Sequence, residues 1–148
     1  MKFEESAGGI VYRKSMTSDS QPIIEWLICQ HSYHKGWGFP KGLIGDTKEN
    51  ESKEETAVRE VDEEGGIKAK IVVSIPKPVE YFYKHEGELI KKRVYYFLME
   101  YISGSPDDHD WEMMDAKFVT TDEVKKILTF KSDKQAFDQA LELFVRKI

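Results

Sequence analysis

Alternating hydrophobic and polar positions predict a chain built mainly from strands. In the first third, residues 6–13 and residues 23–30 have the apolar, alternating character of strands. The polar turn at residues 15–21 joins them, so an antiparallel hairpin is expected. A glycine-rich loop that contains Trp37 and Phe39 follows this hairpin.

Four more segments have strand character: residues 68–75, 79–83, 89–101 and 117–120. Pro76 ends the first of them. Residues 85–88 connect the next two, which are expected to form a second hairpin. The acidic residues 103–110 are interpreted as a loop, either a lid or plain surface.

Helical spacing predicts a helix directly after the glycine-rich loop. Ser52 and Glu55 have the spacing of a capping box, and Gly65 and Gly66 mark the end of the helix. An apolar stripe for packing on a sheet is expected from Ala57, Val58 and Val61.

Two further helices are expected near the C-terminus. Thr121 is predicted to cap a helix that runs to about Leu128, and Ser132 is predicted to open the last one. The apolar side of that last helix is formed by Phe137, Leu141, Phe144 and Val145. Strands and helices together predict an α/β fold.

Size and composition limit the classes of function. The 148 residues fit a single domain, 1–148, and a net charge of −5 without a dominant basic run argues against extended nucleic acid as a partner. No apolar run reaches membrane-spanning length and the first residues are polar, so we expect no membrane partner and a cytoplasmic location. Cys29 is expected to be a buried thiol, the histidines are given no chemistry, and the oligomeric state is left open.

Three glutamates, Glu60, Glu63 and Glu64, are stacked in the last turn of the first predicted helix. Residues three and four apart share a helix face, so the carboxylates repel each other by roughly 0.2 to 0.5 kcal/mol per pair. The negative end of the helix dipole adds to this cost. A divalent cation, Mg²⁺ or Mn²⁺, would offset the repulsion, because hard oxygen ligands are what such ions accept.

The stretch around these glutamates resembles the Nudix box. Gly45 is followed after five residues by Glu51, and after seven more by Arg59-Glu60-Val61-x-Glu63-Glu64-x-Gly66-Ile67. The resemblance implies a metal-dependent hydrolase that acts on a nucleoside diphosphate linked to another group. It also implies the Nudix alpha-beta-alpha sandwich with a mixed central sheet.

The glycine-rich loop just before the box reads WGFPKG. Glycine next to proline lets the backbone come close to a ligand, so the Gly42 carbonyl is a candidate metal ligand and Lys41 a candidate phosphate-binding residue. For Trp37 and Phe39 we favour packing over function.

Four motifs, SAGGIVYR, WGFPKG, KKRVYYFLM and LTFKSDKQAF, are similar to those of asymmetrical bis(5′-nucleosyl)-tetraphosphatases. The resemblance implies cleavage of diadenosine tetraphosphate into ATP and AMP. In that family one glycine serves both the Pro-Lys-Gly motif and the box, and histidine follows it. Here Gly42 and Gly45 are separate and Leu43 replaces the histidine, so either glycine could supply the carbonyl; Gly42 is preferred because it adjoins Lys41.

The same resemblance implies a further acidic ligand, six residues before the aromatic residue of a late strand. Glu112 has this spacing to Phe118, and Asp110 is the alternative. For the adenine, an aromatic platform is expected from Tyr83 and Phe130. Core packing is the competing interpretation for both.

Distal phosphates are expected to bind one or two cations of the second hairpin, Lys91, Lys92 or Arg93, with Arg93 the chosen candidate. The metal ligands are then Glu60, Glu63 and Glu64, with Glu112 and the Gly42 carbonyl. Arg59 is expected to orient the glutamates, through Glu51.

The general base is left open among Glu63, Glu64 and Glu112, since coordination and proton removal compete for the same carboxylates. Alternative activities are removal of pyrophosphate from RNA 5′ ends and hydrolysis of modified nucleoside triphosphates. An alternative from another class is a nucleotide-sensing module without turnover.

Overall fold

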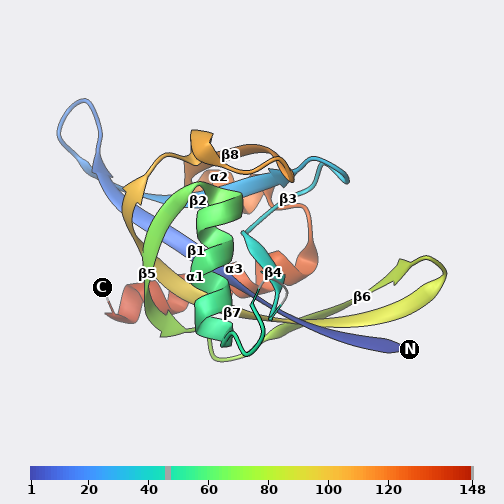
Figure 1. Cartoon of the computed structure of the whole chain (residues 1–148). Coiled ribbons are helices and arrows are strands. Elements are labelled where there is room, and N and C mark those ends of the chain that lie inside the picture. Colours follow the sequence, from blue (N-terminus) through green and yellow to red (C-terminus); the bar gives the residue numbers. More distant parts are fainter. Residues whose placement is uncertain (46–47, 148) are drawn as a thin grey trace.

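The alternating segments pair into one mixed sheet in the computed structural model, which describes residues 1–45 and 48–147 (Figure 1). Its central order is β3-β2-β1-β7-β5, while β4 pairs with β1, β6 with β7 and β8 with β2. Strands β1 and β7 run parallel and the other pairs antiparallel. The described strands are β1 Lys2–Met16, β2 Pro22–His31, β3 Trp37–Gly38, β4 Lys41–Leu43, β5 Ile67–Ser74, β6 Val79–His85, β7 Glu88–Gly104 and β8 Met113–Thr120.

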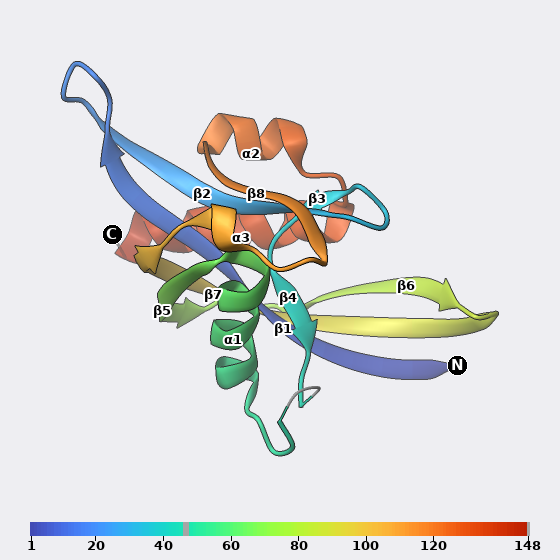
Figure 2. The same cartoon turned by 45° about the horizontal axis from the view of Figure 1, so that its top comes forward.

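Helices cover both faces of this sheet. Helix α1 (Lys53–Gly65) packs on one face, and α2 (Thr121–Ile127) and α3 (Lys131–Lys147) lie on the other (Figures 1 and 2). Alternation in β1 explains the two cores, since Ile10 joins the cluster under α3 and Val11 the cluster under α1. The predicted α/β sandwich with a mixed central sheet is therefore confirmed.

Helix α1 has the predicted start and end. The Ser52 side chain accepts a hydrogen bond from the Glu55 backbone N–H, and the Glu55 side chain accepts one from the Ser52 backbone N–H. Gly66 ends the helix in a left-handed conformation. Ala57 and Val61 are fully buried, as expected. The expectation for Val58 was wrong: its side chain is 37% exposed, because the buried stripe of this helix continues through Glu60 and Glu64 instead.

The second hairpin projects from the sheet together with the first residues of β1 (Figure 2). Its turn consists of Glu86 and Gly87, both with positive φ, which suits the twist of a tight hairpin. Strand β1 begins at Lys2, four residues before the predicted start. Its backbone pairs there with Ile90–Arg93 of β7, and that pairing does not need apolar side chains.

Several predicted boundaries were wrong in detail. The glycine-rich loop contains β3 and β4, and β8 begins four residues before the predicted residue 117 because it pairs along most of β2. The acidic residues 103–110 are only partly a loop, since they include the end of β7 and a short 3-10 helix, η1 (Pro106–Asp108).

The predicted caps of the last two helices shift by one residue. Thr120, not Thr121, caps α2, and the Thr121 hydroxyl instead accepts a hydrogen bond from Trp26 Nε1 at 2.8 Å. Helix α3 begins at Lys131, one residue before Ser132. Among the described residues, no helix is both long and apolar enough to cross a membrane.

Candidate active site

The acidic end of α1 turns two of its three glutamates into the protein. Glu60 and Glu64 are each only 7% exposed, whereas Glu63 is exposed. Burial, with repulsion from Glu60, raises the pKa of Glu64 to about 8. Burial also raises the pKa of Glu60 to about 7. The repulsion expected from the sequence is thus concentrated on two desolvated carboxylates.

Arg59 binds the carboxylates around it with four hydrogen bonds. Its Nε and Nη2 donate to Glu51 at 2.8 and 3.0 Å, and its Nη1 donates to Glu60 at 2.7 Å and to Glu63 at 3.1 Å. The hydrogen bonds from Arg59 lower the pKa of the buried Glu51 to about 2, and Thr56 adds another at 2.7 Å. The contacts expected between Arg59, Glu51 and the helix glutamates are therefore present.

The two candidate glycines have different neighbours. Gly42, in β4, lies so close to Glu60 that a Cβ there would clash with the carboxylate. Gly45 has φ +78°, and its backbone hydrogen bond lowers the pKa of Glu51 rather than serving Glu60 or Glu64. Gly42 therefore adjoins Glu60, whereas Gly45 adjoins Glu51.

Glu112 also faces the buried glutamates, from the start of the segment that leads into β8. Its charge raises the pKa of both Glu60 and Glu64. Asp110 lies nearer the outer glutamate: its backbone N–H donates to the Glu63 carbonyl at 2.8 Å, and its carboxylate accepts from the Glu112 N–H at 3.1 Å. This arrangement favours Glu112 over Asp110 as the additional acidic ligand.

A divalent cation fits the chemistry of this cluster. Glu60, Glu64 and Glu112 repel one another across a desolvated space, and such a set of hard oxygen donors suits Mg²⁺ or Mn²⁺. With the side chains as they lie here, no three acidic, histidine or cysteine residues among those described enclose a metal position. In this arrangement Arg59 donates hydrogen bonds to Glu60 and Glu63.

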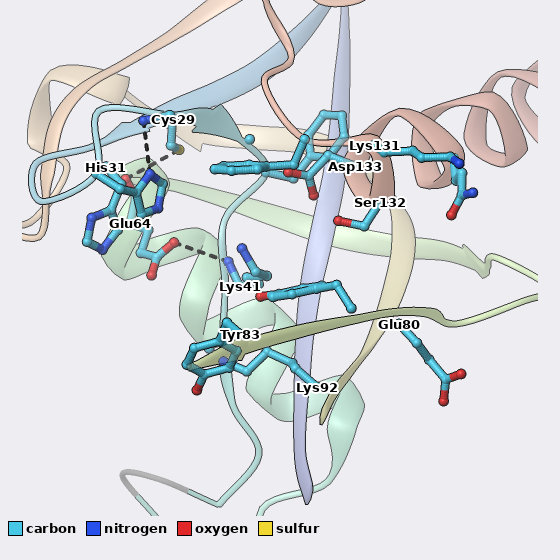
Figure 3. A pocket seen from close by; sticks show the side chains of 18 of the residues that line it. Cys29, His31, Lys41, Glu64, Glu80, Tyr83, Lys92, Lys131, Ser132 and Asp133 are labelled. Atoms are coloured by element: carbon cyan, nitrogen blue, oxygen red, sulfur yellow. Dashed lines mark hydrogen bonds between the residues drawn. The ribbon is translucent and has the colours of Figure 1, made fainter. Parts of the chain in front are cut away.

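A cavity of about 880 Å³ opens beside Glu64 (Figure 3). Lys41 lies in it next to Glu64, whose Oε1 accepts from the Lys41 backbone N–H at 3.1 Å. Nearby acidic groups, Asp133 first, raise the pKa of Lys41 against the effect of its burial. Of the expected site residues, those that line the cavity are Lys41, Gly42, Glu64, Tyr83 and Phe130.

Arg93 is not among the lining residues of the described chain. It is exposed and donates to Glu80 at 2.8 Å, while its neighbour Lys92 lines the cavity. Adjacent residues of a strand point to opposite faces, and on β7 the face that carries Lys92 is the one beside the cavity. The geometry favours Lys92, one of the three alternatives, over the chosen Arg93.

The two expected platform residues line the cavity from different segments of the chain. Tyr83, on β6, donates a short hydrogen bond to Glu4, and its ring lies 6.2 Å from that of Tyr81. Phe130, just before α3, is 43% exposed and meets the ring of His34 edge-on at 5.3 Å. Core packing does not account for Phe130.

Sequence reasoning missed three features of the cavity. Asp133 is buried in its wall and accepts a hydrogen bond from Tyr96 at 2.9 Å. Asp133 belongs to the motif LTFKSDKQAF. The signal available there was an acidic residue on the apolar side of a predicted helix. His31 and His34, given no chemistry, stack at 4.4 Å and line the cavity. Glu4 contacts the wall residues Tyr83 and Lys92, and no motif marked it.

A family model of the NUDIX domain matches residues 5–141, which include the acidic helix and the cavity. The chain belongs to the NUDIX family. Members of this family are hydrolases of nucleotide phosphoanhydrides that generally use divalent metal ions such as Mg²⁺.

Individual NUDIX proteins are similar over part or all of the chain. A curated Mycobacterium tuberculosis (strain CDC 1551 / Oshkosh) protein, provisionally named mutator protein MutT4, is 30% identical over 107 residues. This stretch is 72% of the present chain but 42% of that protein, so the chain spans less than half the length of this relative.

Two solved structures share the fold at low identity. The Caenorhabditis elegans Ap4A hydrolase in a binary complex is 20% identical, with a TM-score of 0.69 over 98% of this chain and 99% of that one. The NUDIX domain of Shewanella oneidensis NrtR, complexed with ADP ribose, is 18% identical, with a TM-score of 0.72 over 97% and 90%.

Proposed function

We propose that this NUDIX hydrolase splits diadenosine tetraphosphate asymmetrically into ATP and AMP, with residues 1–148 acting as one domain. One observation carries the proposal: a single cavity is lined by Glu64 at the acidic helix end, by Lys41 and Lys92, and by the aromatic side chains of Tyr83 and Phe130. A dinucleoside polyphosphate presents complementary parts, namely a multiply charged phosphate chain and aromatic bases.

The acidic end of the cavity is the proposed reaction centre. Glu60, Glu64 and Glu112, with the Gly42 carbonyl, would hold Mg²⁺ or Mn²⁺, and Glu63 would join them once it leaves Arg59. Such ions neutralise charge on phosphoryl oxygens and acidify water. Arg59 keeps the helix glutamates in place through its anchor on Glu51.

Proton removal from the attacking water is assigned to a glutamate of the same cluster, Glu63, Glu64 or Glu112. Glu64 is the first choice because, of these three glutamates, it is the one that lines the cavity in the described part of the chain. Lys41 and Lys92 are assigned to the phosphates, and Tyr83 and Phe130 to the bases by stacking.

A second candidate is hydrolysis of a modified nucleoside triphosphate. It is favoured by the 30% identity over 107 residues to a protein whose name describes a mutator protein. A triphosphate would use the same glutamates and lysines but, with a single base, only one of Tyr83 and Phe130.

Product analysis separates these activities. The protein is incubated in Mg²⁺ with diadenosine tetraphosphate, a panel of nucleoside triphosphates and triphosphorylated RNA, and the products are resolved. ATP with AMP from the dinucleotide supports the proposal, while faster pyrophosphate release from a triphosphate or RNA supports an alternative. Binding without turnover of anything would assign a nucleotide-sensing role. The cytoplasmic location expected from the sequence stays a prediction.

A further inference from the structure

Glu4 is far from the Nudix box in sequence, yet it adjoins the candidate cavity. Strands β1, β7 and β6 lie side by side, with Glu4 in register with Lys92 and Lys92 in register with Tyr81 (Figure 2). Tyr83 is two residues further along β6, on the same face of the sheet. The first residues of β1 therefore lie beside the part of the cavity wall that Lys92 and Tyr83 form.

Glu4 contacts both wall residues through one oxygen. Its Oε1 accepts a short hydrogen bond from the Tyr83 hydroxyl, and Lys92 Nζ lies 3.5 Å from the same atom. The side chains of Glu4 and Lys92 are only 14% and 15% exposed, so this ion pair is shielded from water. Lys92 Nζ also lies 5.4 Å from the ring centre of Tyr83, and the three residues form one unit, the Glu4 cluster.

Lys92 needs such a partner to act as a cation in this place. Its side chain is flexible and desolvated, and Lys41 is a like charge on the same cavity. Burial and Lys41 both disfavour the ammonium form, and Glu4 favours it. A carboxylate beside the lysine holds it in position and keeps it charged where it lines the cavity.

We infer that Glu4 is a positioning residue that holds Lys92 and Tyr83 at the cavity wall, so that Lys92 and Lys41 together receive the phosphate chain. Glu4 itself does not touch the substrate. The inference rests on the proposed function only in taking the ligand to be a polyphosphate.

The next residue of β1 provides a matched control. Glu5 accepts a hydrogen bond from the Tyr95 hydroxyl at 2.7 Å, the same kind of contact on the other face of the sheet. Neither Glu5 nor Tyr95 lines the cavity in the described part of the chain. E4A and E5A each remove one negative charge from the protein. A difference in phosphate affinity between the two variants is therefore due to the position of the carboxylate and not to the net charge.

Calorimetric titration with inorganic tripolyphosphate in EDTA tests the inference without turnover or metal. E4A should bind about tenfold more weakly than E5A, and E4Q should lie between them, because its amide oxygen still accepts from Tyr83. In a K92M background, E4A should change the affinity by less than about twofold, because the probe has no base for Tyr83 to contact.

Three results would overturn the inference: E4A binding as tightly as E5A, a full E4A effect in the K92M background, or no saturable binding by the wild type. With whichever nucleotide the enzyme hydrolyses, E4A should raise KM about tenfold and leave kcat within about twofold. If the protein does not hydrolyse diadenosine tetraphosphate, the tripolyphosphate titration still tests the role of Glu4. The inference and the proposed function can therefore fail independently.

Discussion

Arg59 is the residue that makes an acidic helix end compatible with folding. It neutralises the buried Glu51 with two hydrogen bonds and pairs with Glu60 and Glu63 on the other side. Its planar group with several fixed donors suits this task, whereas a lysine ammonium presents one compact charge. Charge alone therefore does not replace it.

Substituting Arg59 by lysine should lower the free energy of unfolding by about 1 to 3 kcal/mol, because Glu51 keeps a partner but loses its paired donors in a buried place. Denaturant unfolding in EDTA measures the change. R146K is the control, since Arg146 makes a single exposed pair with Glu142, and exposed pairs contribute only about 0 to 1 kcal/mol. Equal stability of R59K and R146K would contradict the role given to Arg59.

Glu64 combines burial with repulsion from its neighbours, so its removal should separate activity from stability. We expect E64Q to lower kcat by roughly a hundredfold to ten-thousandfold while keeping or raising the melting temperature in EDTA. E54Q changes an exposed glutamate in the first turn of the same helix and should keep its activity. An E64Q enzyme with wild-type turnover would remove Glu64 from the mechanism.

The sequence predicted the cavity residues that belong to local motifs better than those that distant segments contribute. Lys41 and Glu64 belong to local motifs with fixed spacing, so both could be named as candidates before the fold was known. Asp133 and Glu4 join the cavity only through pairing and packing of distant segments, which single-sequence periodicity does not report. Choosing Lys92 over Arg93 needed the face of β7, which depends on strand register.

At the scale of elements, α1 carries the acidic cluster and must therefore begin and end at fixed residues. Its capping box at Ser52 and its left-handed end at Gly66 set which residues fall in the last turn. Helix α2 has the same kind of capping box, at Thr120, and carries none of the proposed site residues. The two caps can therefore be compared directly.

S52A and T120A should each lower the free energy of unfolding by about 1 kcal/mol, because each leaves a backbone N–H at a helix start without its acceptor. Chemical denaturation measures this loss. Below the melting range both should keep wild-type kcat, since the rest of α1 still packs through Ala57 and Val61. A large loss of kcat in S52A alone would mean that the first turn of α1 also positions the glutamates.

Element interiors followed from the sequence, but element ends did not. The apolar alternation of residues 6–13 and the capped helix at Ser52 are local signals that packing reinforces. The first residues of β1 and the start of β8 are strands because β7 and β2 offer backbone partners to them. Such pairing depends on the whole sheet, so polar segments of this kind read as loops in isolation.

On the scale of the whole molecule, the buried glutamates couple stability to pH and to metal. Their pKa values, about 7 for Glu60 and about 8 for Glu64, lie above the ordinary value of 4.5. The protonated forms therefore favour folding fully below pH 4.5, and this contribution is lost as pH rises through 7 and 8. Burial lowers the pKa of His31 and His34, so these two residues make the folded protein more stable as pH rises. That gain ends above about pH 7, where both histidines are neutral in the folded and in the unfolded protein.

In EDTA the melting temperature should therefore fall between about pH 7 and pH 9, and E64Q should reduce this fall. Divalent cations bind carboxylates in their charged form, so the stabilisation by Mg²⁺ should grow over the same interval. Thermal unfolding with EDTA or Mg²⁺ at each pH measures both trends, and T120A serves as a control that keeps the pH dependence while lowering every value. A melting temperature that rises with pH in EDTA, or a Mg²⁺ effect that shrinks with pH, would contradict a metal site built from Glu60 and Glu64.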